Sequence, residues 1–379
     1  MIKSKTFPRL YALASNGKTK WWQVEARSGP LGVRENEAEI LVWYGYEGQE
    51  DDKIQFTARR VKEGKNLGRA NETTAFEQAC AEAESMWIKK CDKNYFPTPV
   101  KKIVKEARVL LPMLAHDYKK RGHNVKYPAY VQPKLDGVRC LARKLAPGEI
   151  EFISRGGKNF ETMSHLVPYL DKLMEPGSVF DGELFTPKLT FQQLVSAVKR
   201  QKTASPFTPL VHYWIYDCIL EDKSFDERFN ILSKVLTPDG PVRLVHTFEI
   251  ENEKELLRHH KQFVKAGFEG AIVRNKAGVY RCDFRSPDLL KYKDMMDEEF
   301  TIIGGKEGQG KAEGTVVWTC ITEDGKEFDV RPTGTDEQRR EWWKNLKSFV
   351  GKKLTVKFQN YSDEGVPRFP VAVGIRDYE

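Results

Sequence analysis

The sequence predicts an α+β protein of several domains, and three observations support this fold class. The chain has 379 residues, more than a single domain usually holds. Its middle, about residues 106–296, alternates short apolar strands with helical stretches. Its last part, residues 297–379, is rich in strands. We therefore expect a small α+β N-terminal domain over residues 1–96 and a linker over 97–105, followed by these two further domains.

The first segment predicts three strands and then a helix. Strand-like runs lie at residues 9–14, 20–26 and 39–46. After Asn71, a favourable N-cap, apolar residues recur on one helical face: Ala75, Phe76, Ala79, Cys80, Ala83, Met86 and Trp87. Residues 53–69 predict a loop that carries six cations and one acid. The cations are Lys53, Arg59, Arg60, Lys62, Lys65 and Arg69.

The last segment has the pattern of a small OB-fold barrel, which consists of five strands with one inserted helix. The expected strands are residues 300–304, 315–322, 327–331, 354–359 and 371–375. The expected helix is the charged stretch 336–349. This segment therefore predicts a β-barrel at the C-terminal end of the chain.

Charge and cysteine content narrow the class of protein. The net charge is +8, and residues 97–296 carry 33 Lys and Arg against 24 Asp and Glu, so the middle of the chain is suited to a polyanion such as nucleic acid. The six cysteines are scattered without a Cys-x-x-Cys pair, which argues against a disulfide framework or a zinc ribbon and fits a reducing compartment. No signal region or membrane span is present, so we expect a soluble intracellular protein, in the cytoplasm or in a nucleoid or viral replication compartment.

The run Gln132-Pro133-Lys134-Leu135-Asp136-Gly137-Val138-Arg139 carries the most specific chemistry. It places Lys134 directly after an apparent strand, with a carboxylate two residues on and a cation five residues on. A neighbouring cation and partial desolvation lower the pKa of a lysine, and the neutral amine is a nucleophile. The spacing therefore favours an amine that attacks a phosphorus atom.

Four further motifs follow Lys134 in order. Arg155 comes after a strand, and Glu183 and Glu269 each follow or precede a glycine at a strand. Lys291 and Lys293 are two residues apart on a strand and so face the same side. Together they supply cations for phosphates and carboxylates for a metal ion, which is the set that a nucleotide site requires.

In this order the motifs resemble those of ATP-dependent DNA ligases, which belong to the covalent nucleotidyltransferase superfamily with RNA ligases and mRNA capping enzymes. The resemblance covers about residues 106–379. It implies that Lys134 becomes adenylated, that Arg139, Lys291 and Lys293 act with it in catalysis, and that Arg155 lies near the nucleotide and the 5′-phosphate of the nick. The nucleotide would contact Gln132, Lys134, Arg139, Arg155, Glu183, Tyr216, Lys291, Lys293 and Arg376. Here Tyr216, in the run His212–Asp217, would stack on adenine, while Glu183, Glu269 and Asp377 would contact the metal ion.

The closing run, Arg368-Phe369-Pro370 to Ile375-Arg376-Asp377, resembles the last motif of the ligase OB domain. The resemblance implies that Arg376 and Asp377 orient the departing pyrophosphate. One residue departs from the family pattern, because Tyr378 stands where the family has a lysine.

The family resemblance implies a nucleotidyltransferase (adenylation) domain of antiparallel sheets and helices, followed by the OB-fold domain, with a hinge near residues 294–299. It also implies ATP and Mg²⁺ or Mn²⁺ as cofactors, nicked duplex DNA as partner and a monomeric enzyme without a membrane. An RNA ligase or a capping-type nucleotidyltransferase is the alternative within the superfamily. A non-catalytic DNA-binding scaffold is the alternative outside it.

The N-terminal segment resembles a WGR domain through the run Val42-Trp43-Tyr44-Gly45-Tyr46 and the helix that follows. The family's Trp-Gly-Arg is altered here. WGR domains bind DNA, so the resemblance implies a DNA-binding accessory domain. Its backbone contacts would be Lys53, Arg59, Arg60, Lys62, Lys65 and Arg69. A solvated loop on a protein-docking domain is the alternative.

Overall fold

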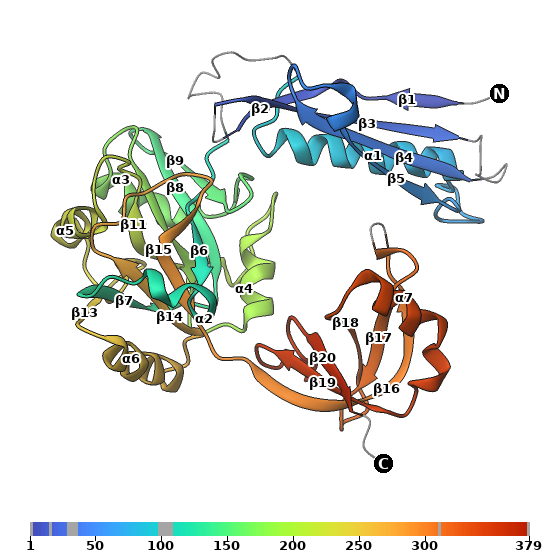
Figure 1. Ribbon diagram of the computed structural model, residues 1–379. Helices are drawn as coiled ribbons and strands as arrows, with labels where there is room; N and C mark the ends of the chain where they lie inside the picture. Colours follow the sequence, from blue (N-terminus) through green and yellow to red (C-terminus); the bar gives the residue numbers. More distant parts are fainter. Residues whose placement is uncertain (1–2, 15–16, 29–36, 98–108, 310–311, 377–379) are drawn as a thin grey trace. The chain divides into compact units, whose positions relative to one another are not determined.

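The structure is a computed structural model that describes residues 3–14, 17–28, 37–97, 109–309 and 312–376 (Figure 1). Two compact units can be distinguished. The first combines residues 1–109, 303–319 and 334–350, and the second combines residues 110–302, 320–333 and 351–379. Asp377 and Tyr378 of the closing motif, and most of the predicted linker, lie outside the described residues.

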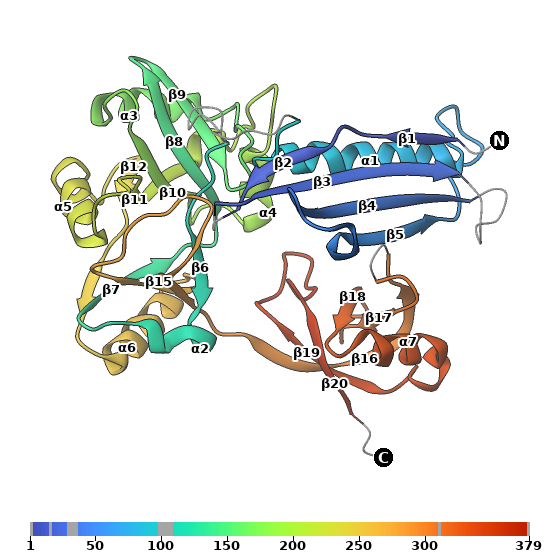
Figure 2. The ribbon, with the colours of Figure 1, turned by 45° about the horizontal axis from the view of Figure 1, so that its top comes forward.

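The N-terminal part is an antiparallel sheet with one helix packed on one face (Figures 1 and 2). The strand order is β1-β3-β4-β5, with β2 paired to β3. The elements are β1 (Ser4–Thr6), β2 (Leu10–Leu13), β3 (Thr19–Ser28), β4 (Ala38–Tyr46), the short 3-10 helix η1 (Asp51–Lys53), β5 (Gln55–Val61) and α1 (Ala75–Cys91). Ala79 and Ala83 of α1 pack against Val24 and Ile40 of the sheet, so the predicted apolar face of the helix is confirmed.

Two details of this part differ from the sequence-based expectation. Thr74, not Asn71, caps α1, because its side chain and that of Glu77 form a reciprocal capping box. Residues 55–61 were predicted as loop, and that was wrong. They form β5, whose backbone pairs with β4 from Gln55 opposite Tyr44 to Val61 opposite Ala38. By pairing with the long strand β4, the edge strand β5 satisfies its backbone N–H and C=O groups. The charged composition of residues 55–61 gave no sign of this pairing.

The middle part contains two five-stranded sheets with the orders β12-β11-β10-β8-β9 and β13-β7-β14-β15-β6. Most neighbours are antiparallel, as predicted, while β12 and β6 pair in parallel at the edges. The strands are β6 (Leu114–Asp117), β7 (Ala129–Lys134), β8 (Val138–Ala146), β9 (Glu149–Ser154), β10 (Val179–Phe185), β11 (His212–Cys218), β12 (Val242–Leu244), β13 (Phe248–Ile250), β14 (Gly270–Asn275) and β15 (Arg285–Tyr292). The helices are α2 (Tyr118–Arg121), α3 (Val167–Leu173), α4 (Phe191–Val198), α5 (Phe225–Val235) and α6 (Glu253–Lys265).

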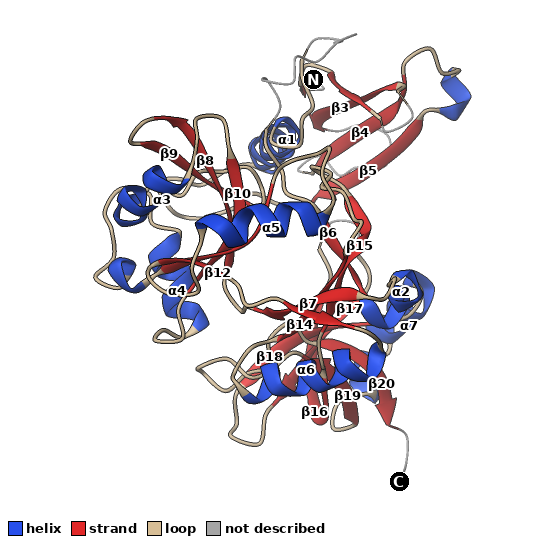
Figure 3. Cartoon of the chain, turned by 90° about the vertical axis from the view of Figure 1, so that its left-hand side faces the viewer, coloured by secondary structure: helices blue, strands red, loops and turns tan. Residues whose placement is uncertain are grey.

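Each sheet of the middle part has its own apolar core. Leu170 of α3 and Leu194 of α4 are buried against the β8–β12 sheet. Leu256 and Phe263 of α6 are buried against β7 and β14, and α6 lies along these strands in Figure 3. Helices cover one face of each sheet, and polar side chains of both sheets point into the space between them.

The C-terminal part is a closed barrel with the strand order β16-β17-β18-β20-β19. Its elements are β16 (Met296–Glu307), β17 (Val316–Ile321), β18 (Glu327–Pro332), α7 (Asp336–Lys344), β19 (Lys353–Phe358) and β20 (Val371–Arg376). Trp318, Val356 and Phe358 on its strands are buried. The predicted OB-like barrel is thus confirmed, with the helix between the third and fourth strands. Within the described ranges, no helix has both the length and the apolar composition of a membrane span.

Candidate active site

A cavity of about 220 Å³ lies in the middle part of the chain, and both of its sheets supply the lining. Seven of the residues predicted for the nucleotide site line it: Gln132, Lys134, Arg139, Arg155, Glu183, Tyr216 and Lys291. Gln132 and Lys134 belong to β7, whereas Glu183 belongs to β10 of the other sheet. The fold therefore brings together side chains that the sequence separates widely.

Lys134 is the last residue of β7, and its side chain is held by a buried carboxylate. Its Nζ donates to Glu269 Oε2, and the Glu269 backbone N–H donates to the Lys134 carbonyl at 2.9 Å. Lys293 Nζ donates to the other oxygen, Oε1 of Glu269, at 3.2 Å. Glu269 therefore holds Lys134 and Lys293 on a common partner at the edge of the cavity.

Lys291 completes a group of three lysines. Burial lowers its pKa, and the nearby charges of Lys293 and Lys134 lower it further. Lys291 lies on β15, which pairs with β14, and β14 pairs with β7. Repulsion within such a group is relieved when an anion binds, so the arrangement is suited to phosphate.

Arg139 is fixed in place by the carboxylate of Asp181. Its Nε and Nη2 donate to the two oxygens of Asp181 at 3.0 and 2.6 Å, a bidentate pair. Tyr280 Oη donates to the same carboxylate at 2.7 Å. Asp181 is fully buried on β10, so the Arg139 guanidinium is held rigidly at the cavity wall.

Glu183 lies on the same strand as Asp181 but faces the cavity. Burial raises its pKa to about 7, although the charges of Lys134 and Arg139 act in the opposite direction. Tyr216 Oη donates to Glu183 Oε2 at 3.4 Å. A carboxyl group poised near neutrality can bind a hydroxyl group or a cation at this position.

The Tyr216 ring lies beside two guanidinium groups. The ring centroid is 5.8 Å from Cζ of Arg139 and 5.4 Å from Cζ of Arg274. Arg274 in turn donates from Nε to Gln132 Oε1 at 2.8 Å, and Gln132 Nε2 donates to Thr247 at 2.9 Å. The ring is thus a fixed aromatic surface that lines the cavity.

Sequence reasoning missed the ionic network behind this surface. Asp217, fully buried on β11, accepts from Nε and Nη2 of Arg228 at 2.7 and 3.1 Å and from Nη1 of Arg274 at 2.7 Å. The sequence did contain a signal, because a charged residue inside an apolar strand is costly unless it is paired. Asp217 and Arg274 both have that setting, but their pairing spans 57 residues.

The motif aspartate Asp136 also has a partner that was not predicted. Arg368 donates from Nη1 and Nη2 to the two oxygens of Asp136 at 2.8 and 3.2 Å. Arg376, by contrast, is not among the residues that line the cavity. Its Nε donates to Glu299 at 3.0 Å and to Thr355 at 2.9 Å, both on the barrel. The predicted nucleotide contact of Arg376 stays a prediction, as does the metal contact of Asp377.

The predicted DNA-binding cations of the N-terminal part are not among the residues that line this cavity, and several are paired with carboxylates. Arg59 and Lys65 pair with Glu82 of α1, and Lys53 pairs with Glu50. Lys62 lies 3.2 Å from Glu313 in the same compact unit. Arg60 and Arg69 are exposed. Their role in DNA binding stays a prediction.

Comparison with known proteins agrees with this geometry. Residues 112–293 match the family described as ATP dependent DNA ligase domain, and residues 307–376 match the DNA ligase OB-like domain. A DNA ligase of an African swine fever virus isolate is 30% identical over 342 residues, which are 84% of this chain and 79% of that protein. The DNA ligase of enterobacteria phage T4 is 25% identical over 246 residues, or 51% of this chain and 50% of that protein.

Among solved structures, that of a Lig E DNA ligase superimposes with a TM-score of 0.60 at 25% sequence identity, covering 72% of this chain and 100% of that one. The matched families cover both the domain that holds the cavity and the barrel. The chain belongs to the ATP-dependent DNA ligase family.

Proposed function

We propose that this protein seals nicks in duplex DNA that carry a 5′-phosphate and a 3′-hydroxyl group, with Lys134 as the nucleophile. One observation carries the proposal: Lys134 opens onto a cavity that is also lined by Arg139, Glu183, Tyr216 and Lys291. A nucleophile, phosphate-neutralising cations and an aromatic surface therefore surround one space.

The reaction proceeds in three group transfers. In the first, Lys134 Nζ loses a proton and attacks the α-phosphorus of ATP, so that a P–N bond forms and the P–O bond to pyrophosphate breaks. In the second, an oxygen of the nick 5′-phosphate attacks the same phosphorus, AMP moves to the DNA and the lysine nitrogen regains its proton. In the third, the 3′-hydroxyl oxygen attacks the 5′-phosphorus, loses its proton and expels AMP.

The chain's own side chains position these steps. Tyr216 stacks on the adenine ring, and Gln132 stabilises that wall through its hydrogen bond from Arg274. Arg139, Lys291 and Lys293 neutralise charge on the phosphates as it spreads in the transition state. Arg155, on the turn after β9, lines the same cavity, which supports its proposed contact with the 5′-phosphate of the nick.

The carboxylates fit a loosely held divalent cation, for which we propose Mg²⁺, with Mn²⁺ as a substitute. Among the described residues no group of three or more His, Cys, Asp or Glu side chains forms a metal cage. Mg²⁺ in phosphoryl-transfer sites is commonly held by one or two carboxylates together with substrate phosphates, and Glu183 and Glu269 match that donor set. When bound, the ion would neutralise phosphate charge.

We also propose that the N-terminal sheet and helix bind DNA. Lys53 ends η1, just before β5, and the other cations predicted for phosphate contacts lie on or after β5: Arg59, Arg60, Lys62, Lys65 and Arg69. Exchange of their carboxylate partners for DNA phosphates is favourable at low salt because counterions are released from the DNA.

The test is a sealing assay on a labelled duplex with one 5′-phosphorylated nick, with ATP and Mg²⁺. We expect Lys134→Ala to abolish both sealing and the lysine–AMP adduct, while Lys172→Ala, at an exposed position on α3, leaves both unchanged. An adduct on Lys134 without DNA sealing would redirect the substrate to RNA or to a cap. Absence of any adduct in the intact chain would leave a DNA-binding scaffold.

A further inference from the structure

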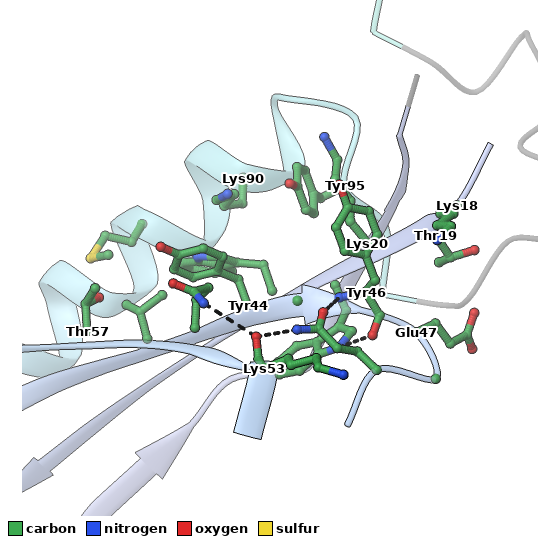
Figure 4. A pocket seen from close by; sticks show the side chains of 18 residues that line it. Lys18, Thr19, Lys20, Tyr44, Tyr46, Glu47, Lys53, Thr57, Lys90 and Tyr95 are labelled. Carbon is green, nitrogen blue, oxygen red and sulfur yellow. Dashed lines mark hydrogen bonds between the residues drawn. The ribbon is translucent and has the colours of Figure 1, made fainter. Parts of the chain in front are cut away.

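The N-terminal part contains a second cavity, of about 1240 Å³, whose lining includes Tyr44 and Tyr46 of the WGR-like run as well as Lys53 (Figure 4). Strands β3 and β4, the β4–β5 connection, β5 and the end of α1 form its walls. Lys90 and Tyr95 lie on one side, and Tyr44 and Lys53 lie on the other (Figure 4). The cavity lies where α1 ends, and there part of the helix-facing side of the sheet is uncovered.

The strand register places aromatic and cationic residues on this uncovered face. Lys20 is paired with Tyr46, and Trp22 is paired with Tyr44, so their side chains alternate along one face of the sheet. Tyr44 is 39% exposed and Tyr46 is 42% exposed. Two accessible tyrosines within a cavity provide flat apolar surfaces that a planar ring system can stack on.

The charge of the cavity is strongly positive. Its described lining residues include four lysines and one acid: Lys18, Lys20, Lys53 and Lys90, and Glu47. Burial, together with the nearby charges of Lys20 and Lys93, lowers the pKa of Lys90 to about 8. Lys90 Nζ is 4.4 Å from the Tyr95 ring centroid and 5.1 Å from that of Trp22. Its cation is thus held among aromatic rings and repelled by other cations, so a bound anion would stabilise it.

The rim of the cavity is preorganised by one glutamine. The Tyr46 backbone N–H donates to Gln49 Oε1 at 2.9 Å, and Gln49 Nε2 donates to the Lys53 carbonyl (Figure 4). Trp21 Nε1 also donates to the Tyr46 carbonyl at 3.2 Å. These bonds fix the connection that carries Tyr46 and Lys53, so a ligand need not order it on binding.

The ligand must match both the charge and the aromatic surfaces. A phosphate chain satisfies the lysines, and bases satisfy the tyrosines, so the two features together indicate a nucleic acid. The volume exceeds the range of roughly 300–1,000 Å³ that is typical of small-molecule sites, which favours a polymer over a mononucleotide.

We propose that this cavity, defined by Lys20, Trp22, Tyr44, Tyr46, Lys90 and Tyr95, binds unpaired nucleotides of a DNA strand. In a duplex the base faces are stacked on one another, so a protein ring inside a cavity cannot reach them. Unpaired nucleotides expose these faces, and their backbone can follow the lysines. The inference rests on the proposed action on DNA and specifies which DNA feature the accessory domain takes.

The test is fluorescence anisotropy of the full chain with a labelled oligothymidylate of about 12 nucleotides, within the usual site size of single-strand binders. A blunt duplex of equal length is measured beside it. Tyr44→Ala removes a stacking surface, and Lys90→Gln removes a cavity cation. Lys89→Gln is the matched control, because Lys89 is the exposed neighbour on the same helix and does not line the cavity.

We expect Tyr44→Ala to weaken single-strand binding by roughly tenfold. Lys90→Gln should also weaken it and reduce the slope of log affinity against log salt by about 0.7, as loss of one phosphate contact predicts. Tyr44→Ala should leave that slope unchanged, and Lys89→Gln should change affinity by less than about twofold. Lysine–AMP formation and the thermal midpoint of each variant show whether the chain remains folded.

Unchanged single-strand affinity in folded Tyr44→Ala would overturn the inference. An equal loss of duplex affinity would also overturn it, since the cavity would then contact paired DNA. These results are independent of nick sealing. If the chain seals nicks but Tyr44→Ala leaves single-strand affinity unchanged, only the proposed single-strand site is wrong. If the chain binds single strands at this site but neither seals nicks nor forms the lysine–AMP adduct, only the proposed reaction is wrong.

Discussion

At the scale of single residues, Arg274 shows how a side chain without a motif can support the active site. It is 3% exposed, and its guanidinium bonds Asp217 and Gln132 while it lies beside the Tyr216 ring. Because Asp217 also holds Arg228, removal of Arg274 alone leaves a buried carboxylate half satisfied. We therefore propose that Arg274 positions the Tyr216 ring, for which stacking on adenine is proposed above.

We predict that Arg274→Leu lowers the free energy of unfolding by about 3 kcal/mol and raises the KM for ATP in adenylation more than it lowers kcat. Urea unfolding and single-turnover adenylation would measure the two effects. Arg200→Leu, at an exposed position, is the control and should change the unfolding free energy by less than about 0.5 kcal/mol. An unaltered KM in Arg274→Leu would show that the Tyr216 ring keeps its place without this support.

Glu183 gives a prediction about pH. Its pKa is raised by burial from 4.5 in a free side chain to about 7, so between these values the folded state binds more protons than the unfolded state. The free energy of unfolding of the nucleotide-free protein should therefore fall as pH rises through this window. Glu183→Gln lacks this pH dependence. Relative to that of the wild type, its free energy of unfolding should therefore rise by on the order of 1–3 kcal/mol from pH 4.5 to 7.5. Parallel pH series of chemical unfolding would reveal a flat difference if Glu183 titrates normally.

Site residues could be predicted from the sequence where the residues that reveal their role are close to them in the chain. Lys134 and Lys291 stand in short motifs whose spacing reveals their chemistry, and both line the cavity. Asp181 and Asp217 carry no such motif, because their partners lie on other strands, 42 and 57 residues away for Arg139 and Arg274. Only the presence of a charge in an apolar strand hinted at them.

At the scale of secondary structure, two motif glycines are required by close strand packing. A Cβ at Gly182 would lie 2.5 Å from the Trp214 carbonyl oxygen on β11, and a Cβ at Gly137 would lie 2.6 Å from the Leu184 carbonyl oxygen on β10. Real Cβ atoms do not approach backbone so closely. Gly182 thus lets β10 and β11 pair where Glu183 enters the cavity.

We predict that Gly182→Ala lowers the free energy of unfolding by about 1–3 kcal/mol and slows adenylation, because β10 must shift away from β11. Gly304→Ala is the control, since a Cβ there meets nothing within 4 Å. Thermal unfolding and adduct formation should separate the two variants. Equal stability of both would mean that the strand pair adapts without strain.

Strands were easier to predict from alternation than from composition. The five barrel strands follow their apolar pattern, whereas β5 was masked by the cations at Arg59 and Arg60. Residues 55–61 form a strand because they pair with β4, and their own residue preferences do not indicate a strand without that partner. The start of α1 was misjudged for a similar reason, because the capping box depends on Glu77 as well as on the cap residue.

At the scale of the whole molecule, the nucleotide cavity is complete without the N-terminal part, since its lining residues lie between Leu114 and Lys291. We predict that deletion of residues 1–96 leaves lysine–AMP formation unchanged and weakens binding to nicked DNA. Adduct formation and anisotropy at physiological salt would test this, with circular dichroism to confirm folding. Unchanged affinity for the nick would remove the DNA-binding role of that part.

The position of Lys134 and Glu269 has a consequence for folding. The two residues are 135 positions apart in the chain. Lys134 ends β7 and Glu269 directly precedes β14 of the same sheet, while Arg139 and Asp181 come from the other sheet. Such distant pairings form late and slowly, because long loops must close before their contacts stabilise the structure. During refolding from denaturant, covalent labelling of Lys134 by ATP should therefore lag behind the recovery of helical signal. The rate of adenylation would then report when the last long-range contacts form, rather than when the chain first collapses.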